Sequence, residues 1–536
     1  MTTVRASRRL LATLAVVSAA AAAALVWSGT QYPGPGLYGD GAGYLGAAES
    51  FAQHGTLRVP FANYDSADST AALAQWPPGF SLVLSVPLMA GAGPRAAIRI
   101  VQTAVGAALI ALTAVLVATA TAPVWGAVTA VALLVTPAIV AVDLNVVSEP
   151  LYLMCLAIAL WGMVWRPGRP LTYGLAAAGA VLVRYLGAAA IVAAGVWAGV
   201  QPGSAGRRVR RVAIAVGPGL VAGELWRVYI RWAGGAARPL HVDHQVGSAL
   251  RQLAGATAAW LAPWDLGTGS SWIARSQQAG FKLVFSAAIA AALIAEIRAQ
   301  VVSRRAMPDT VASAGPAGAT DSPPATRLLA ASVLLAACHV AALLAARLLY
   351  SDVAFYDRVL APVHYLVGVA VVTLIASQWT GAPAAVRWVL PAIGLAWVVG
   401  SAATTTQLLQ IATVVGLDHA NLGERRGPTI QWLRANGSGG PIYTNEPAKI
   451  FFHLNRDSRS LPWILDADTV QTLERALRAR PGFVVWFTGG TAASYVAPDL
   501  LPRASTPAKL QAALPLREVA RGTDGVVWEL DPSVAR

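Results

Sequence analysis

Charged residues are scarce in this 536-residue sequence. Asp, Glu, Lys and Arg make up 12% of the positions, hydrophobic residues make up 56%, and the mean hydropathy is +0.55. A soluble chain carries about a quarter charged residues and divides into globular domains. The apolar residues here instead form repeated runs, each long enough to cross a hydrocarbon core of about 30 Å. The composition therefore excludes an ordinary soluble protein and predicts a polytopic membrane protein.

Lysine and cysteine are nearly absent as well. The only lysines are Lys282, Lys449 and Lys509, so arginine carries the net charge of +14. The arginines cluster in short segments between apolar runs, where they orient helices in a bilayer, and we therefore expect no nucleic-acid partner. The richness in Ala, Gly and Arg is typical of a GC-rich bacterial genome. Both cysteines, Cys155 and Cys338, lie inside apolar runs, which argues against a disulfide framework or a thiolate metal site.

The first apolar run, Leu10 to Trp27, follows Arg5, Arg8 and Arg9. It ends without an A-x-A-like cleavage site and is longer than the apolar region of most signal peptides. We therefore expect a retained first span whose amino terminus lies in the cytoplasm.

Placing the arginine-rich loops in the cytoplasm predicts about eleven spans in a bacterial inner (plasma) membrane, with the carboxyl terminus outside. The loop around Arg207–Arg211 and the Pro/Ala/Ser-rich linker 298–327 are predicted to be cytoplasmic. The run 171–200 is too long for one crossing, and we expect it to form two short helices that break at Arg184 and Tyr185. The remaining predicted spans are 96–118, 123–142, 151–165, 212–232, 281–297, 328–350, 359–378 and 385–409.

Two regions do not fit a spanning pattern. The long first outer loop, 29–95, contains an apolar stretch, Leu82–Met89, that is too short to cross and is predicted to be re-entrant or interfacial. From 417 to 536 the content of charge, Gly and Pro rises. Short β-like runs and one helical pattern predict a small extracytoplasmic α/β domain there, beside a membrane domain spanning 1–416. The β-like runs are Pro441–Thr444, Phe483–Phe487 and Val526–Leu530, and the helical pattern covers Thr469–Arg480. The expected fold class is thus mainly α.

Ionisable side chains gather near the predicted outer boundary of the membrane. Charges at that depth are costly and are functional candidates by default. A group of carboxylates and guanidinium groups could deprotonate a hydroxyl and hold a phosphate. The candidates are Asp40, Glu49, Asp143, Glu149, Arg184, Asp352, Asp357 and Arg358.

The main candidates each have a second interpretation. Asp40 could act as a base, or could cap a helix predicted over 41–53, and both roles can coexist. Glu149 could bind a sugar or an acceptor, or could be a carboxylate that stabilises a helix start at Pro150. Arg358, and after it Arg184, could hold a phosphate, or could form a structural ion pair.

A metal site is only weakly indicated. His241 and His244 have a suitable spacing, but no third ligand accompanies them, so a divalent metal is possible without being supported by the sequence. The nearby Trp260, Trp264 and Trp272 are expected to form an interfacial belt and not a sugar-binding platform.

Four motifs occur in order along the chain: Asp40-Gly-x-Gly-Tyr44, Trp76-Pro-Pro-Gly-Phe80, Ser148-Glu-Pro-Leu151 and Arg358-x-Leu-x-Pro362. Together with the predicted topology, this order resembles the multispanning GT-C glycosyltransferases. The most similar group is the superfamily of protein O-mannosyltransferases and aminoarabinose transferases. The resemblance extends over the whole chain, including the domain after 416.

This resemblance implies a polyprenyl-phosphate sugar donor, inversion at the anomeric carbon, and an Asp base in the first outer loop. By position that base is Asp40, with Tyr44, Glu49, Glu149, Arg184 and Arg358 as substrate-binding candidates. Two positions depart from the family pattern. Many relatives have two adjacent acids where Asp40 stands alone, and Val359 replaces a residue that is often aromatic. The acceptor, whether glycan, lipid or protein, is not indicated.

Two other functional classes remain open on the sequence. A transporter or flippase also places charges near the membrane boundary, but it typically shows similar halves and paired interrupted helices at the midplane. A non-catalytic envelope-assembly protein could keep the same fold. Convergence of Asp40, Glu149 and Arg358 in space would favour the transferase.

Overall fold

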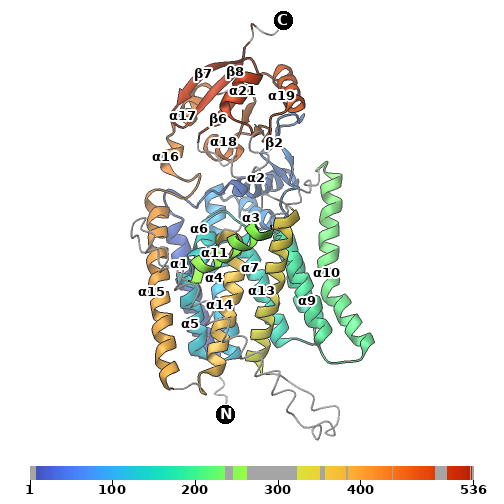
Figure 1. Cartoon of the computed structure of the whole chain (residues 1–536), viewed down its shortest axis with the longest axis vertical. Helices are drawn as coiled ribbons and strands as arrows, with labels where there is room; N and C mark the ends of the chain where they lie inside the picture. Colours follow the sequence, from blue (N-terminus) through green and yellow to red (C-terminus); the bar gives the residue numbers. More distant parts are fainter. Residues whose placement is uncertain are drawn as a thin grey trace.

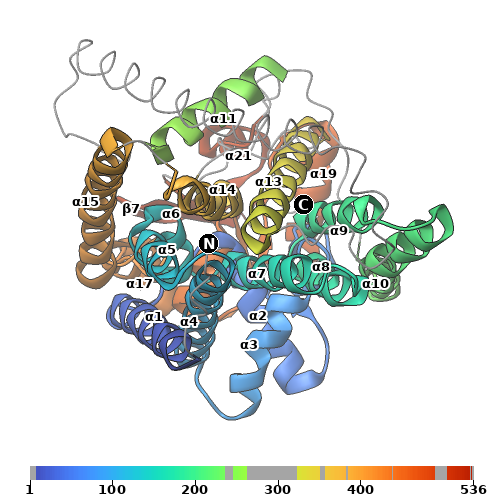
Figure 2. The same ribbon diagram turned by 90° about the horizontal axis from the view of Figure 1, so that it is seen from below.

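The computed structural model describes residues 8–235, 246–261, 323–349, 357–381, 384–437, 439–488, 504–531 and 533. Figure 1 shows a bundle of long helices with a mixed α/β unit at one end, and the described amino-terminal end of α1 points away from that unit. Figure 2 looks along the bundle from the opposite end. The predicted span 281–297, most of the linker 298–327, and His241, His244, Trp264 and Trp272 lie outside the described residues.

Six helices in the described residues are long and apolar enough to cross a membrane. They are α1 (Arg8–Gly29), α4 (Pro94–Ala120), α10 (Ala205–Trp232), α13 (Pro324–Leu349), α14 (Asp357–Gln378) and α15 (Ala384–Val414). The predicted span over 123–142 is divided into α5 (Pro123–Val135) and α6 (Pro137–Leu144), which meet at a bend of 63°. The pair would make a seventh span if the two helices cross the membrane together. Pro137 lacks the N–H that would continue α5.

Shorter apolar helices occupy other predicted positions. They are α3 (Gly79–Met89), α7 (Glu149–Trp165), α8 (Pro170–Val183) and α9 (Ala188–Val200). The predicted break at Arg184 is confirmed, because a 3₁₀ turn, η1 (Tyr185–Gly187), separates α8 from α9. Arg207–Arg211 are helical and not a loop, since they belong to the start of α10, and their cytoplasmic location stays a prediction. The total of eleven spans stays a prediction.

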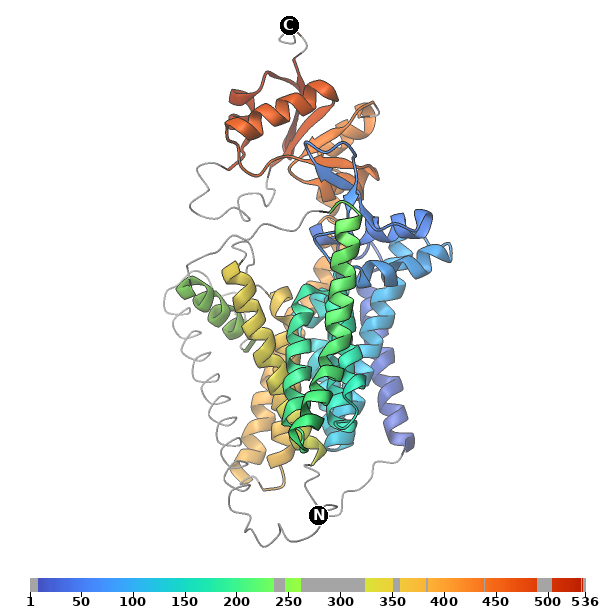
Figure 3. The same ribbon diagram turned by 90° about the vertical axis from the view of Figure 1, so that its right-hand side faces the viewer.

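The first loop, 29–95, is folded. It contains α2 (Gly39–His54), the short antiparallel pair β1 (Arg58–Val59) and β3 (Ala71–Ala72), the strand β2 (Phe61–Asn63), and α3. Figure 3 shows the blue α2 and α3 lying between the bundle and the α/β unit.

Glycines let the loop pack tightly onto α2. A Cβ atom at Gly43 would lie 2.3 Å from the Trp76 ring, and one at Gly46 would lie 2.3 Å from Pro60. Any other residue at Gly43 or Gly46 would therefore clash unless Trp76 or Pro60 moved. The glycine spacing in the first motif therefore fixes the position of α2 against Trp76.

The α/β unit is built on a six-stranded sheet of order β2-β5-β4-β6-β8-β7. Four strands are parallel: β2, β5 (Ser458–Ser460), β4 (Ile442–Thr444) and β6 (Phe483–Phe487). The strands β8 (Gly525–Leu530) and β7 (Leu516–Gly522) continue it antiparallel. Its helices are α16 (Leu422–Arg425), α17 (Pro428–Asn436), α18 (Pro447–Leu454), α19 (Ala467–Ala479) and α21 (Pro507–Ala513).

The predicted β-like runs correspond to β4, β6 and β8, and the predicted helix corresponds to α19. The sheet differs from the expectation in one respect: its edge strand β2 comes from the first loop and pairs with β5. Backbone hydrogen bonds thus join the first loop to the region after 416.

An ionic cluster holds the start of the α/β unit together. The Glu424 carboxylate accepts a hydrogen bond from His419 Nδ1 at 2.8 Å and lies 3.7 Å from the Lys449 ammonium and 3.9 Å from His453 Nε2. Burial opposes ionisation of Glu424, but the hydrogen bond from His419, the nearby His453 and the charge of Lys449 outweigh it, so the pKa of Glu424 lies below its usual range. Lys449 and His453 belong to α18, which contacts α2.

This cluster predicts acid sensitivity of the α/β unit. Because the folded-state pKa of Glu424 is lowered, its contribution to stability is complete above its ordinary value of 4.5 and is lost as the pH falls below it. Glu424→Gln should lower the melting temperature at pH 7 and flatten its fall between pH 5 and pH 3, measured by thermal unfolding of the purified protein. Glu518→Gln, which breaks an exposed pair with Arg521, is the matched control. If the melting temperature fell equally in Glu424→Gln and in wild type between pH 5 and pH 3, Glu424 would not be the cause of the acid sensitivity.

Candidate active site

Three helices begin at one place at the end of the bundle that carries the α/β unit. Asp40 lies in the first turn of α2, Glu149 is the first residue of α7, and Arg358 is the second residue of α14. The amino-terminal ends of helices carry partial positive charge, which stabilises carboxylates and attracts phosphate groups. The fold thus brings together three candidates that are far apart in the sequence.

Arg358 bridges the two carboxylates. Its NH2 group donates to Asp40 Oδ2 at 2.6 Å, and its Nε donates to Glu149 Oε1. The guanidinium carbon lies 4.4 Å from the centre of the Tyr38 ring, a distance suited to a cation–π contact. The planar guanidinium of Arg358 is therefore held through its Nε and NH2 groups and on one face.

Arg184 forms the second half of the site. Its NH1 group lies 2.7 Å from Glu149 Oε1 and donates to Ser148 Oγ at 3.1 Å. Ser148 Oγ is in turn 3.0 Å from the Tyr44 hydroxyl. Burial raises the pKa of Tyr44, so its hydroxyl stays protonated. A chain of polar groups therefore runs from α2 through Ser148 to Arg184 and Glu149.

The two carboxylates differ in their access to solvent. The Glu149 side chain is 1% exposed, whereas the Asp40 side chain is 32% exposed, and Arg358 is 10% exposed. Ion pairs at exposed positions contribute about 0–1 kcal/mol. Removing one partner of a buried pair costs about 3–5 kcal/mol. Glu149 is accordingly the fixed anchor of the group, and Asp40 lies at its open edge.

The interpretation of Asp40 as a helix cap is wrong. The helix begins at Gly39, two residues earlier than expected, so Tyr38 occupies the cap position. Among the described residues, the side chain of Asp40 is paired with Arg358 and does not cap α2. Glu149 does lie in the first turn of its helix, as its second interpretation required, and it contacts both arginines as well.

Two predicted candidates lie apart from the group. Glu49 is nine residues beyond Asp40 on α2, which places it on the opposite face of the helix. It makes no ion pair within the described part of the chain, and burial raises its pKa to about 7. Asp143 is buried in α6 beside Gly106. The side chains of Asp352 and Asp357 lie outside the described residues.

Sequence reasoning missed two contributors. Ser148 belongs to a quoted motif, but nothing in the sequence showed that its hydroxyl would join Tyr44 to Arg184. Asp418 follows α15, and its neighbour His419 donates from its backbone to the carbonyl of Leu37. Burial raises the pKa of Asp418, and the charges of His419 and Arg358 lower it by less. Its left-handed backbone, φ 48°, is the conformation that Asp tolerates better than most residues.

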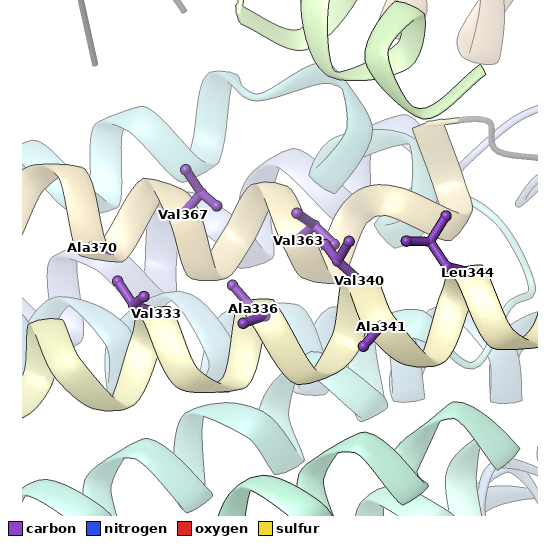
Figure 4. A pocket seen from close by; sticks show the side chains of 9 residues that line it. Val333, Ala336, Val340, Ala341, Leu344, Val363, Val367 and Ala370 are labelled. Atoms are coloured by element: carbon purple, nitrogen blue, oxygen red, sulfur yellow. The ribbon is translucent and has the colours of Figure 1, made fainter. Parts of the chain in front are cut away.

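A groove lies between α13 and α14. Its volume is about 470 Å³, and its lining is almost wholly aliphatic. Figure 4 shows Val333 and Val340 of α13 facing Val363 and Val367 of α14 across it. Val363 comes five residues after Arg358, so the groove begins about 8 Å further along the axis of α14 than the backbone of Arg358.

No family model and no curated protein matches the sequence, but solved structures resemble the fold. ArnT from Cupriavidus metallidurans bound to undecaprenyl phosphate is 14% identical, with a TM-score of 0.51, over 97% of this chain and 98% of ArnT. The arabinofuranosyltransferase AftD from Mycobacteria is 15% identical, with a TM-score of 0.51, over 99% of this chain and 42% of AftD. Both are membrane glycosyltransferases of GT-C fold. This chain has the GT-C fold, as predicted, and is a multi-pass membrane protein.

Proposed function

We propose that this GT-C protein transfers a sugar from a polyprenyl-phosphate donor to a hydroxyl of an extracytoplasmic acceptor, with inversion at the anomeric carbon. The observation that carries the proposal is the convergence of Asp40, Glu149 and Arg358, with Arg184 behind them. A proton acceptor beside two largely enclosed guanidinium groups suits sugar transfer from a lipid phosphate. ArnT, whose fold is similar, was solved with undecaprenyl phosphate bound.

The donor phosphate is proposed to bind at Arg358. A guanidinium fork matches phosphate oxygens and keeps its charge throughout the reaction. The helix starts of α2, α7 and α14 add positive potential at the same point. Both effects grow in importance as the glycosidic bond breaks, because the leaving phosphate then gains negative charge.

Asp40 is proposed to activate the acceptor. The acceptor oxygen attacks the anomeric carbon, and its proton passes to the Asp40 carboxylate. The bond from the anomeric carbon to the phosphate oxygen breaks, and its electron pair leaves with the polyprenyl phosphate. Since phosphate is a good leaving group, the step needs no general acid. Glu149 and Tyr44 complete the wall of the site.

The polyprenyl chain is proposed to lie in the groove between α13 and α14. The groove starts about 8 Å further along α14 than Arg358, on a face turned by about 140° from it. Its aliphatic lining suits an isoprenoid chain. A lipid phosphate with its head at the guanidinium would pass its chain around α14 to reach this groove.

Filling this groove should weaken donor binding selectively. Ala337→Trp and Ala341→Trp introduce bulk at two alanines that line it, and we expect a rise in donor KM of about tenfold with kcat within about twofold of wild type. Steady-state kinetics at saturating acceptor measure both constants. Ala392→Trp, at an exposed position of α15, is the control and should behave as wild type. An unchanged donor KM in both groove variants would remove the groove from the proposal.

The site is proposed to face the extracytoplasmic side of a bacterial inner membrane. The arginine-rich starts of α1 and α10 lie at the end of the bundle away from the α/β unit (Figure 1). Such ends are cytoplasmic by the positive-inside rule. The α/β unit and the site therefore belong on the outer face.

One experiment tests donor class and orientation together. Right-side-out and inside-out membrane vesicles that contain the protein are incubated with labelled polyprenyl-phosphate sugars or with nucleotide sugars. We expect transferred label only from the lipid-linked donors in right-side-out vesicles. Transfer from nucleotide sugars would contradict the proposal. Failure to transfer label from any of the donors would contradict it as well.

A further inference from the structure

The two carboxylates on Arg358 are held unequally. Glu149 is buried and shares its Oε1 between Arg358 and Arg184. Asp40 is about one-third exposed, and within the described residues its ion pair is with Arg358 alone. A ligand that competes for Arg358 would therefore displace Asp40 before it displaced Glu149.

Two guanidinium groups face two carboxylates in this group, so an entering phosphate adds a negative charge beside Asp40 and Glu149. The NH2 group of Arg358 donates to Asp40 Oδ2 at 2.6 Å. The phosphate and the base thus compete for the same donor atom.

We infer that the donor phosphate itself releases the base, by replacing Asp40 on Arg358 while Glu149 and Arg184 stay in place. This inference rests on the proposed function and adds the control of the same site. Glu149, Arg184 and Ser148 are positioning residues in it, because they hold the Nε edge of Arg358 while its NH2 edge changes partner.

The exchange sets an order of events. Without donor, Asp40 Oδ2 is engaged by the guanidinium and is not available to an acceptor hydroxyl. With donor bound, Asp40 is free and takes the acceptor proton. When polyprenyl phosphate leaves, Arg358 pairs with Asp40 again, which favours loss of that proton to water. The base is released only while a lipid phosphate occupies Arg358.

The test uses the full-length protein in nanodiscs and polyprenyl phosphate without sugar as the probe. Asp40→Asn removes the competing charge, so it should bind the probe about fivefold more tightly than wild type, although it cannot catalyse transfer. Asp40→Glu keeps the charge and should bind as wild type does. Asp68→Asn, at an exposed pair with Arg58, controls for surface charge. Polyprenol, which lacks the phosphate, should bind wild type and Asp40→Asn equally.

Equal affinity of wild type and Asp40→Asn for polyprenyl phosphate would overturn the inference. So would tighter binding of polyprenol to Asp40→Asn, because the gain would then not depend on charge. Either result leaves sugar transfer by wild type unaffected, so the proposed function would survive it. If wild type neither binds polyprenyl phosphate nor transfers sugar from it, the proposed function itself fails.

Discussion

Asp40→Asn is expected to lower the rate of sugar transfer by about 100-fold or more, because it removes the proton acceptor and leaves the shape of the side chain intact. The amide oxygen can still accept a hydrogen bond from Arg358. The ion pair that is lost lies at the open edge of the site and contributes little to stability. The protein should therefore fold, insert and bind donor. Single-turnover transfer from a labelled polyprenyl-phosphate sugar measures the loss.

The control for this variant is Asp68→Asn, which lies in the same loop but outside the site and should transfer sugar at the wild-type rate. Near-wild-type turnover of Asp40→Asn would exclude Asp40 as the base. Glu49 is a poor substitute, since it lies on the opposite face of α2. Asp418, which approaches the site from the segment after α15, would then be the next carboxylate to replace.

Arg358→Ala is expected to lower kcat/KM for donor by about 1000-fold, because the phosphate loses its charge-assisted donors in the transition state. Arg358→Lys keeps the charge but loses the fork that reaches both carboxylates and the phosphate, and a loss of about 10–100-fold is expected. The KM for acceptor should not change in either variant. Steady-state kinetics with each substrate varied in turn measure these effects.

A structural role for Arg358 gives a different pattern. Arg358 is 10% exposed and pairs with buried Glu149, so its loss could destabilise the protein by about 3–5 kcal/mol. Glu149 keeps Arg184 as a partner in Arg358→Ala, which limits this cost. If the surviving protein showed a normal donor KM and a lowered melting temperature, Arg358 would be a structural residue. If Arg358→Lys is stable but has a lowered kcat/KM for donor, Arg358 binds the phosphate.

The long helices and the site candidates were predictable from the sequence. Long apolar runs are local signals, and a charge at membrane depth carries a large energetic cost. Apolar runs mark helices that cross a bilayer, and Arg184 inside such a run marks a break. The high cost of charge at membrane depth pointed to eight ionisable residues, which include Asp40, Glu149 and Arg358 from three distant segments. It could not show that Glu49 and Asp143 lie apart from the others.

Features that depend on tertiary packing were not predictable from the pattern. The strand β2 is three residues long and has no periodicity that would distinguish it from loop, yet it completes the sheet by pairing with β5. The bend at Pro137 has a local cause, the missing N–H of proline, but the run of apolar residues continues across it. The start of α10 at Ala205 lies among arginines that carry no apolar signal. The cap interpretation of Asp40 was wrong because helix boundaries shift by one or two residues.

A structure of the protein with polyprenyl phosphate tests the central claim most directly. The account predicts phosphate oxygens within hydrogen-bond distance of the Arg358 guanidinium, Glu149 still paired with Arg184, and the isoprenoid chain entering the groove between α13 and α14. A phosphate bound away from Arg358, with the contact between Arg358 and Asp40 unchanged, would contradict it.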